Sequence, residues 1–299
     1  METEGGKEIA KTCARLISRV FRTIIRFFSF GEKGWEAFFE RAVTRFMIRF
    51  FFLNRTVGFI RPFNKEEGWT IYDGLYYIAP FDAISVINEV KRVYVKPKKG
   101  DVVLDVGAHY GFYSLLASCL VGVKGCVLAF EPHLHNYRRL AANLRLNGIK
   151  NVKAFNLALG EFNGRAKLYT DGESGAYSTF FKRGARYQKV RMVRLDTVAT
   201  QMGLEKLDLI KIDIEGAELS VLEGARETIQ KFKPKLTIAG YHFLDEITKL
   251  EQWLRANYAF YEIKTMSNGF LHAWPHALAR IKSTNILGEM PEGETTTCA

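Results

Sequence analysis

Short apolar segments alternate with amphipathic segments of helical period along the second two thirds of the chain. The pattern predicts buried strands over 102–106, 126–130, 152–157, 208–212 and 235–239. It predicts helices over 111–121, 133–147, 197–202, 217–231 and 244–256. The series also contains a predicted hairpin of 165–169 with 190–195, and two further strands within 258–286. Such alternation indicates an α/β fold with a mostly parallel sheet and helices on both faces.

The first hundred residues follow a different pattern. Two amphipathic helices are predicted over 8–28 and 35–53, each with regularly spaced arginines and with phenylalanines among the apolar positions. Residues 57–81 alternate as paired strands do, and 82–95 have helical period. The expected organisation is a basic amphipathic helical extension (1–56), a β/helix lead-in segment (57–97), the main α/β domain (98–287) and a polar tail (288–299).

Positive charge is concentrated in the extension. The 299 residues carry a formal net charge of +11. Residues 1–61 alone hold twelve Lys and Arg against six Glu, so the much longer remainder is closer to neutral. Basic, aromatic-rich amphipathic helices are able to lie in a membrane interface. Peripheral membrane contact through residues 8–53 is therefore one expectation, and packing of these helices on the next domain is the alternative.

Composition excludes several other classes of protein. A chain that is 47% hydrophobic is not wholly disordered. It contains no run of eighteen apolar residues, and arginines interrupt its N-terminal apolar stretch, so neither a spanning helix nor a signal peptide is expected. Its four dispersed cysteines predict free thiols in a reducing compartment. The expected location is cytoplasmic, peripheral at the membrane surface.

The strongest candidate chemistry lies in LDVGAHYGFYS, residues 104–114. Asp105 ends a buried strand, and Gly107 and Gly111 frame the turn into the next helix. Glycines let a ligand approach the backbone closely. The third glycine of a dinucleotide-binding GxGxxG motif is absent, and a carboxylate ends the strand. A cofactor that carries an ammonium group suits this charge better than a pyrophosphate does.

A second acidic residue follows the next strand. Glu131 stands in FEP, 130–132, 24 residues after Gly107. An acidic side chain at this place can accept hydrogen bonds from both ribose hydroxyls of a nucleoside. Together, in this order and spacing, the two motifs predict an adenosine-type cofactor. A Rossmann-like domain that binds NAD or no ligand stays open as the alternative.

Four downstream segments narrow the prediction: ANLRLNG (142–148), LALGE (157–161), RLDT (194–197) and LDLIKIDIEGAELSVLEGA (207–225). With the two motifs, they resemble the FkbM family of class I S-adenosylmethionine-dependent methyltransferases, over roughly 95–245. The resemblance implies a Rossmann-like sheet and S-adenosyl-L-methionine as the cofactor. It also implies methyl transfer to a hydroxyl oxygen of a sugar, a lipid-linked compound or another metabolite.

The resemblance further implies which residues bind the cofactor. They are Asp105, Gly107, His109, Gly111, Glu131, Asn156 and Asp213. His109 stands where the family more often has asparagine, and it can donate or accept a hydrogen bond at the amino-acid end of the cofactor. Glu131 is expected to hold the ribose, and Asn156 or its neighbour Ala158 to lie near the adenine.

A hydroxyl acceptor needs help to lose its proton. The candidate catalytic residues are Asp213, Glu215 and His242. Asp213 and Glu215 lie two residues apart at a strand end, so one can face the cofactor and the other the acceptor. His242 follows the fifth parallel strand, at the edge where open α/β sheets bind ligands, and its ordinary pKa near 6.5 suits proton acceptance. No further clear ligand accompanies the carboxylates, so no metal is assigned.

The expected partner is a small-molecule, glycan or lipid-linked acceptor, and the sequence does not indicate an oligomeric state. An RNA methyltransferase that uses the basic surface is one alternative. It is disfavoured because no NPPY or DPPY motif follows strand 208–212, and the acidic groups there repel a phosphate backbone. A non-catalytic, membrane-associated factor with a methyltransferase fold is the other. The presence of Asp105, Glu131 and Asp213 argues against it.

Overall fold

The computed structural model describes residues 61–62, 67–72, 75–80, 90, 94–170, 177–178 and 186–276. The predicted helices 8–28 and 35–53, most of the predicted helix 82–95 and the tail 288–299 lie outside these residues. The α/β part of the chain, which these residues cover, contains the candidate site and the elements that support it.

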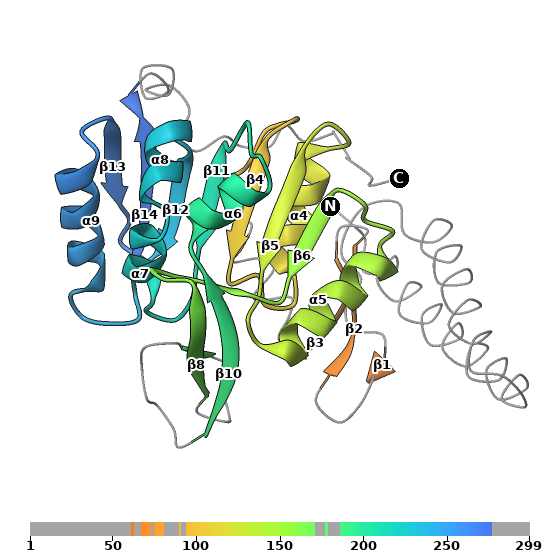
Figure 1. Cartoon of the computed structure of the whole chain (residues 1–299). Helices are drawn as coiled ribbons and strands as arrows, with labels where there is room; N and C mark the ends of the chain where they lie inside the picture. The colour runs from red at the N-terminus through yellow and green to blue at the C-terminus, as the bar shows by residue number, and fades with distance from the viewer. Residues whose placement is uncertain are drawn as a thin grey trace, which may run out of the picture. The chain divides into compact units, whose positions relative to one another are not determined.

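A seven-stranded sheet organises this part of the chain (Figure 1). Its strands, in spatial order, are β13 (Tyr261–Thr265), β14 (Phe270–Pro275), β12 (Lys235–Ala239), β11 (Leu209–Ile212), β4 (Val102–Val106), β5 (Cys126–Phe130) and β6 (Val152–Phe155). Neighbouring strands from β12 to β6 are parallel, whereas β14 runs antiparallel to both β12 and β13. The predicted mostly parallel sheet is confirmed.

The order of the strands creates a switch point. The chain passes from β4 outward through β5 to β6, and then returns to place β11 beside the other edge of β4. The carboxyl ends of β4 and β11 therefore lead into loops that diverge to opposite sides. Open α/β sheets bind ligands at such a crevice.

Helices cover both faces of the sheet, as the alternation predicts. They are α4 (Phe112–Val121), α5 (Leu134–Leu146), α6 (Leu195–Gln201), α7 (Glu218–Glu223), α8 (Arg226–Phe232) and α9 (Glu246–Asn257). Leu104 and Ile210 point into the core shared with α6 to α9. Their neighbours Val103 and Leu209 point into the core shared with α4 and α5. Successive strand residues thus serve opposite faces, as the pleat requires.

Two smaller sheets accompany the large one. One contains β7 (Ala158–Leu159), β8 (Gly164–Thr170), β9 (Tyr177–Ser178) and β10 (Arg186–Val193). Its antiparallel strands β8 and β10 confirm the predicted hairpin, and they project beyond the edge where the parallel strands end (Figure 1). The other contains β1 (Arg61–Pro62), β2 (Glu67–Tyr72) and β3 (Leu75–Pro80), which confirms the strand pattern of 57–81.

The predicted helix 217–231 is wrong in its continuity, because the structure divides it into α7 and α8. The division falls at Gly224. A Cβ at this position would lie 1.9 Å from the carbonyl oxygen of Gly160, so the chain can pass only without a side chain. The Gly224 carbonyl accepts a hydrogen bond from the Asp196 amide at 3.0 Å instead of continuing the helix.

The structure also bears on two predictions from composition. Cys126 is a free thiol, but Cys119 is disulfide-bonded, so the prediction of free thiols is wrong for Cys119. In the ranges that the structure describes, no helix combines the length and the apolar character needed to span a bilayer.

Candidate active site

The turn between β4 and α4 is built from left-handed backbone. Gly107, His109 and Gly111 have φ angles of 76°, 52° and 91°. A Cβ at Gly107 would lie 2.0 Å from the carbonyl oxygen of Asp213, so only glycine lets this turn touch the end of β11. Holding His109 in this conformation costs about 1–3 kcal/mol, and strain of this kind clusters at ligand sites.

Asp105, at the end of β4, is fully buried and already paired. Its Oδ2 accepts a hydrogen bond from the Ser114 hydroxyl at 2.6 Å, and its Oδ1 lies 3.1 Å from the Lys211 ammonium. Lys211 is buried on β11 and also donates to the carbonyl oxygens of Val106 and Gly107, at 3.3 and 2.8 Å. Asp105 therefore fixes Lys211, and Lys211 fixes the glycine turn.

Glu131 joins the two turns that follow β4 and β5. Its Oε2 accepts the backbone N–H of His109 and its Oε1 that of His133, both at 2.8 Å. Burial outweighs these two hydrogen bonds and raises the pKa of Glu131 to about 7. A carboxylate offers about four lone-pair sites. Two sites therefore remain for hydroxyl donors of a ligand.

Asn156 supports the backbone of this same turn. Its Nδ2 donates to the carbonyl oxygens of Glu131 and Pro132, both at 2.9 Å. Asn156 directly follows β6, which ends at Phe155, earlier than the predicted strand 152–157. Both amide hydrogens are used on the backbone, and Oδ1 is the remaining polar atom of the side chain.

His109 presents a neutral imidazole. Burial and the nearby Lys211 lower its pKa to about 4. The ring stacks on Tyr110, with centroids 4.3 Å apart and 5° between the planes. A neutral ring can donate or accept a hydrogen bond, as predicted, without placing a positive charge beside the turn.

Asp213 stands at the end of β11, on the other side of the switch point. Its Oδ2 accepts a hydrogen bond from the Tyr94 hydroxyl at 2.5 Å, and its Oδ1 lies 3.5 Å from the Tyr241 hydroxyl. Burial and the Asp213 charge raise the pKa of Tyr94 well above its usual range, so Tyr94 remains a donor. The Asp213 side chain is 22% exposed, whereas that of Asp105 is fully buried. Of the two strand-end aspartates, Asp213 is thus the one with an exposed side-chain surface.

A second left-handed segment follows Asp213. Glu215 has φ 60° and Gly216 has φ 95°. The two loops that meet at the contact between Gly107 and Asp213 therefore each hold one non-glycine residue in a sparsely populated conformation. Backbone strain of this kind is typical of ligand sites, so both loops are candidates for contact with a ligand.

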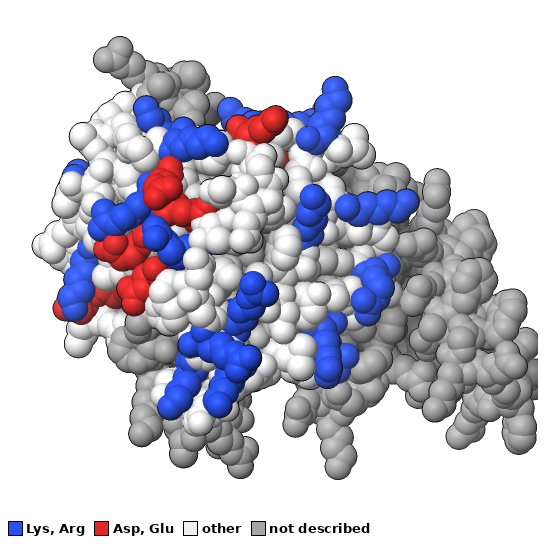
Figure 2. Space-filling view, in the orientation of Figure 1, with Lys and Arg blue, Asp and Glu red and all other residues white. Residues whose placement is uncertain are grey.

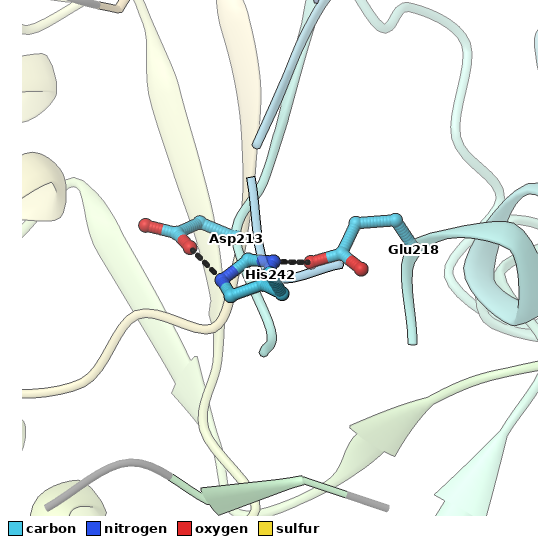
Figure 3. A group of neighbouring side chains, drawn as sticks. All are labelled: Asp213, Glu218 and His242. Atoms are coloured by element: carbon cyan, nitrogen blue, oxygen red, sulfur yellow. Dashed lines mark ion pairs between the residues drawn. The ribbon is translucent and has the colours of Figure 1, made fainter. Parts of the chain in front are cut away.

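His242, which follows β12, lies among four carboxyl groups. Its Nε2 is 3.7 Å from Asp213 and from Glu215, and its Nδ1 is 3.2 Å from Glu246 and 3.6 Å from Glu218. Figure 3 shows Asp213 and Glu218 on opposite sides of the ring. Burial lowers the pKa of His242, but Glu246 and then the other three carboxyls raise it to about 9. The ring is therefore an imidazolium at neutral pH. Its predicted role as a proton acceptor assumed an ordinary pKa near 6.5, so this pKa differs from the prediction.

Two of these carboxyls, those of Glu218 and Glu246, interact with one another. Glu218 is fully buried, and its Oε1 accepts the backbone N–H of Ile214 at 3.0 Å. Burial and the adjacent Glu246 raise the pKa of Glu218 to about 8. Burial acts on Glu246 in the same direction, but hydrogen bonds from His242 and Glu218 lower its pKa overall. At pH 7 Glu218 therefore keeps its proton and Glu246 carries the charge.

Asp213, Glu218 and His242 also satisfy the distances of a metal-ligand set, with donor atoms within 4.8 Å of one another. In the observed arrangement both ring nitrogens of His242 face carboxyl oxygens. An imidazolium donates from both nitrogens and has no lone pair for a metal. The geometry therefore favours a cluster that shares protons, with the ring as its cation.

Sequence reasoning missed Tyr94, Lys211 and Glu246. Lys211 does give a signal, because a lysine within a buried strand is rarely tolerated without a partner. Glu246 gives a weaker one, four residues after His242. Tyr94 reaches Asp213 across 119 residues of sequence, and no local pattern identifies it.

The part of the chain that holds this site is similar to known proteins. Residues 105–261, just over half of the chain, match the family described as Methyltransferase FkbM domain. The crystal structure of Methyltransferase FkbM from Methylobacillus flagellatus aligns with a TM-score of 0.49 at 20% identity, over 62% of this chain and 48% of that one.

Three relatives have described activities. The 2-O-methyltransferase NoeI of Sinorhizobium fredii is 28% identical over 171 residues, 51% of this chain and 68% of NoeI. The hexuronic acid methyltransferase AglP of Haloferax volcanii is 25% identical over 179 residues, 56% of this chain and 64% of AglP. The AMB antimetabolite synthetase AmbE of Pseudomonas aeruginosa is 31% identical over 161 residues, 41% of this chain. That match spans only 8% of AmbE.

Proposed function

The chain belongs to the FkbM methyltransferase family, and we propose that it methylates a hydroxyl oxygen of a sugar or other metabolite with S-adenosyl-L-methionine. The observation that carries the proposal is the partly exposed carboxylate of Asp213, beside the strained glycine turn at the switch point. In S-adenosyl-L-methionine the methyl group is bonded to a sulfonium sulfur. The neutral thioether that remains after transfer is a good leaving group. The protein's tasks are therefore to bind, to orient and to remove a proton.

The turns after β4 and β5 fit such a cofactor. The remaining lone pairs of Glu131 can accept the two ribose hydroxyls. Gly107 and Gly111 let the ligand reach the backbone. The cofactor's ammonium and sulfonium are cationic, and Asp213 supplies negative charge next to the turn. Asp105, His109 and Asn156 complete the proposed binding set, with Asp105 acting on the turn through Lys211.

Among the three candidate catalytic residues, we propose Asp213 as the general base. Its carboxylate is partly exposed and reachable, and the Tyr94 hydroxyl fixes its orientation. Asp213 takes the proton from the acceptor hydroxyl as that oxygen becomes the nucleophile. General-base help of this kind contributes about 10²–10⁴-fold to the rate.

His242 and Glu215 then act around the base. His242 lies within 3.7 Å of both Asp213 and Glu215, and its positive charge keeps two carboxylates close to one another. We assign His242 as a positioning residue for Asp213. Glu215, one third exposed, extends the acidic surface toward the acceptor.

The proposed acceptor class is carbohydrate hydroxyl. NoeI is described as a 2-O-methyltransferase and AglP as a hexuronic acid methyltransferase. We place the acceptor beside Asp213 and Glu215, because their acidic side chains disfavour a nucleic acid backbone and suit neutral hydroxyls.

Transfer of a labelled methyl group into a cell extract tests the proposal, with the product divided into lipid, glycan, RNA and protein fractions. We expect label in the glycan or glycolipid fraction with the natural chain, and far less with Asp213→Asn. Label in RNA would overturn the acceptor class. Cofactor binding without any labelled fraction would support the non-catalytic alternative.

The basic residues of 8–53 support a separate proposal, peripheral contact with a membrane surface. The support is their amphipathic pattern in the sequence. Replacement of Arg15, Arg19, Arg22 and Arg26 by glutamine should lower co-sedimentation of the full chain with anionic vesicles. Unchanged sedimentation would reject this role for the first predicted helix.

A further inference from the structure

The β8–β10 hairpin presents an unusual face. In its antiparallel register three like pairs stand directly opposite one another: Arg165 with Arg191, Lys167 with Lys189, and Tyr169 with Tyr187. Alternate residues of each strand point the same way, so these six side chains share one face. The four cations and Tyr187 are exposed, while Leu168, Val190 and Met192 on the opposite face are buried in a small core.

Folding alone does not account for this face. Like charges directly opposite on neighbouring strands destabilise a sheet. Among the residues that the structure describes, none of the four cations lies in an ion pair; Lys167 instead lies over the Tyr187 ring, 4.8 Å from its centroid. The whole segment 164–193 holds seven Lys and Arg against two Asp and Glu. An anionic partner would relieve the repulsion.

The shape of the face indicates the kind of partner. The two strands project from the body as a ribbon, and Figure 2 shows Lys and Arg gathered over this part of the surface. The Tyr169 and Tyr187 rings are tilted at 58° with centroids 5.9 Å apart, so they form no flat platform for stacking a base or a sugar. They lie at the end of the hairpin away from β7, beyond the four cations.

Cations followed by tyrosines toward a projecting end match the order of chemistry in a bilayer interface. Anionic headgroups attract Lys and Arg within a Debye length of the surface. Tyrosine rings settle at the headgroup level, with an apolar body and a polar tip. We propose that the outer face of the β8–β10 hairpin, formed by Arg165, Lys167, Tyr169, Tyr187, Lys189 and Arg191, docks on an anionic lipid bilayer.

Docking has a consequence for the site. The hairpin projects from the edge of the sheet where the parallel strands end (Figure 1), the edge that carries Asp213 and His242. A chain held by the hairpin would present this edge toward the membrane. Binding to vesicles needs no methyl transfer, so the proposal stands or falls independently of the proposed activity.

Co-sedimentation of the full chain with vesicles is the test. Vesicles of phosphatidylcholine are compared with vesicles that also contain phosphatidylglycerol. The variant is Lys167→Gln with Lys189→Gln, which keeps side-chain length and removes one like-charge pair, so the hairpin should fold at least as well. The matched control is Lys124→Gln with Lys150→Gln, an equal charge change at two exposed lysines in the loops that lead into β5 and β6.

We expect the hairpin variant to lose at least about tenfold in partition onto the anionic vesicles, since each basic residue near the surface contributes severalfold. The control should change by less than about twofold, because its lysines lie at the opposite edge of the sheet. Neither the hairpin variant nor the control variant should bind vesicles of phosphatidylcholine alone. All residues of 8–53 are present in both variants, so a selective loss belongs to the hairpin.

Equal partition of the hairpin variant and the natural chain overturns the proposal, as does a natural chain that ignores anionic vesicles. A further arm uses heparin and polyuridylate in place of vesicles. Retention by either polyanion that depends on Lys167 and Lys189, without vesicle binding, would assign the face to a soluble polyanion instead. Circular dichroism and unfolding by denaturant confirm that each variant is folded before its binding is compared.

Discussion

The two sides of the switch point hold their carboxylates in opposite ways. On the side of β4 and β5, Asp105 and Glu131 are buried, and each has fixed donors from a lysine, a hydroxyl or backbone amides. On the side of β11 and β12, four carboxyls surround one imidazole, and Asp213 remains partly in solvent.

This difference assigns two roles to one edge of the sheet, ligand binding and proton exchange. Groups whose donors are fixed hold shape and present a constant surface to a ligand. Groups whose pKa values are moved apart by their neighbours are suited to exchange protons. Changes on the first side should therefore affect stability and cofactor binding, and changes on the second side should affect turnover and pH dependence.

The largest effect is expected on the proton-sharing side. Asp213→Asn removes the proposed base and keeps the acceptor for the Tyr94 hydroxyl, so turnover should fall about 10²–10⁴-fold. Glu215→Gln, two residues away, should cost less than about tenfold. Initial rates with the acceptor identified by labelling measure both. An equal loss in the two variants would break the assignment of the base to Asp213.

The next effect tests the fixed side. Lys211→Met leaves the Asp105 carboxylate buried without its cation, which costs about 3–5 kcal/mol of unfolding free energy at pH 7. Lys206→Met is the matched control, since its ion pair with Asp208 has the same 3.1 Å distance but a side chain that is 53% exposed. The control should lose at most about 1 kcal/mol.

The loss in Lys211→Met should shrink as pH falls. Without lysine the buried carboxylate has no compensating cation, and acid favours a folded state in which that unpaired charge is neutralised. Denaturant unfolding at pH 7 and pH 5 measures this change. A loss of the same size at both pH values would mean that packing, not charge, is what Lys211 provides.

A smaller effect concerns pH dependence on the proton-sharing side. The pKa of His242 is raised from 6.5 to about 9, so its contribution to stability is complete below pH 6.5 and is lost as pH rises through 9. The contribution is about 3–4 kcal/mol, at about 1.4 kcal/mol per pKa unit. The unfolding free energy of the natural chain should therefore fall by this amount between pH 6.5 and 9.5. His242→Gln should not show this fall.

Glu218→Gln serves as the comparison for this measurement. Glu218 keeps its proton at neutral pH, so the amide replaces a neutral group of similar shape and His242 should still titrate late. The measurement is the unfolding free energy of the natural chain, His242→Gln and Glu218→Gln as a function of pH. If the natural chain and His242→Gln decline in parallel, the four carboxyls do not hold an imidazolium.

The smallest effect returns to the fixed side. Asn156→Ala removes two hydrogen bonds to the carbonyls of Glu131 and Pro132, and should cost about 1–2 kcal/mol of unfolding free energy. Because these bonds position the backbone of Glu131, cofactor affinity should weaken severalfold as well. Loss of stability with unchanged affinity would show that Asn156 supports the turn without shaping the ribose site.

The same contrast explains how far the sequence predicts the fold. Strands β4, β5 and β12 begin and end where the apolar pattern places them, because a strand buried on both faces is mostly apolar along its length. The break between α7 and α8 is not predictable in this way. It depends on the approach of the Gly160 backbone to Gly224, which only the folded chain brings about.

The candidate site divides similarly. Glu131 and Asp213 are identifiable because each ends a strand within a recognisable motif. The charge state of His242 is not, since it depends on carboxyls from the β11 loop, α7 and α9 that meet only in the fold. Tyr94 is missed for the same reason, although it donates the hydrogen bond that orients Asp213.

Calorimetric titration of the full chain with S-adenosyl-L-methionine tests the central claim most directly, and it needs no acceptor. At pH 8, above the pKa of Glu131 of about 7, the carboxylate is ionised and can accept the ribose hydroxyls. We expect saturable binding by the natural chain and by Glu227→Ala, an exposed glutamate on α8. Glu131→Ala, still folded by circular dichroism, should bind at least about tenfold more weakly. Unchanged affinity in Glu131→Ala, or no binding by the natural chain, would contradict the account.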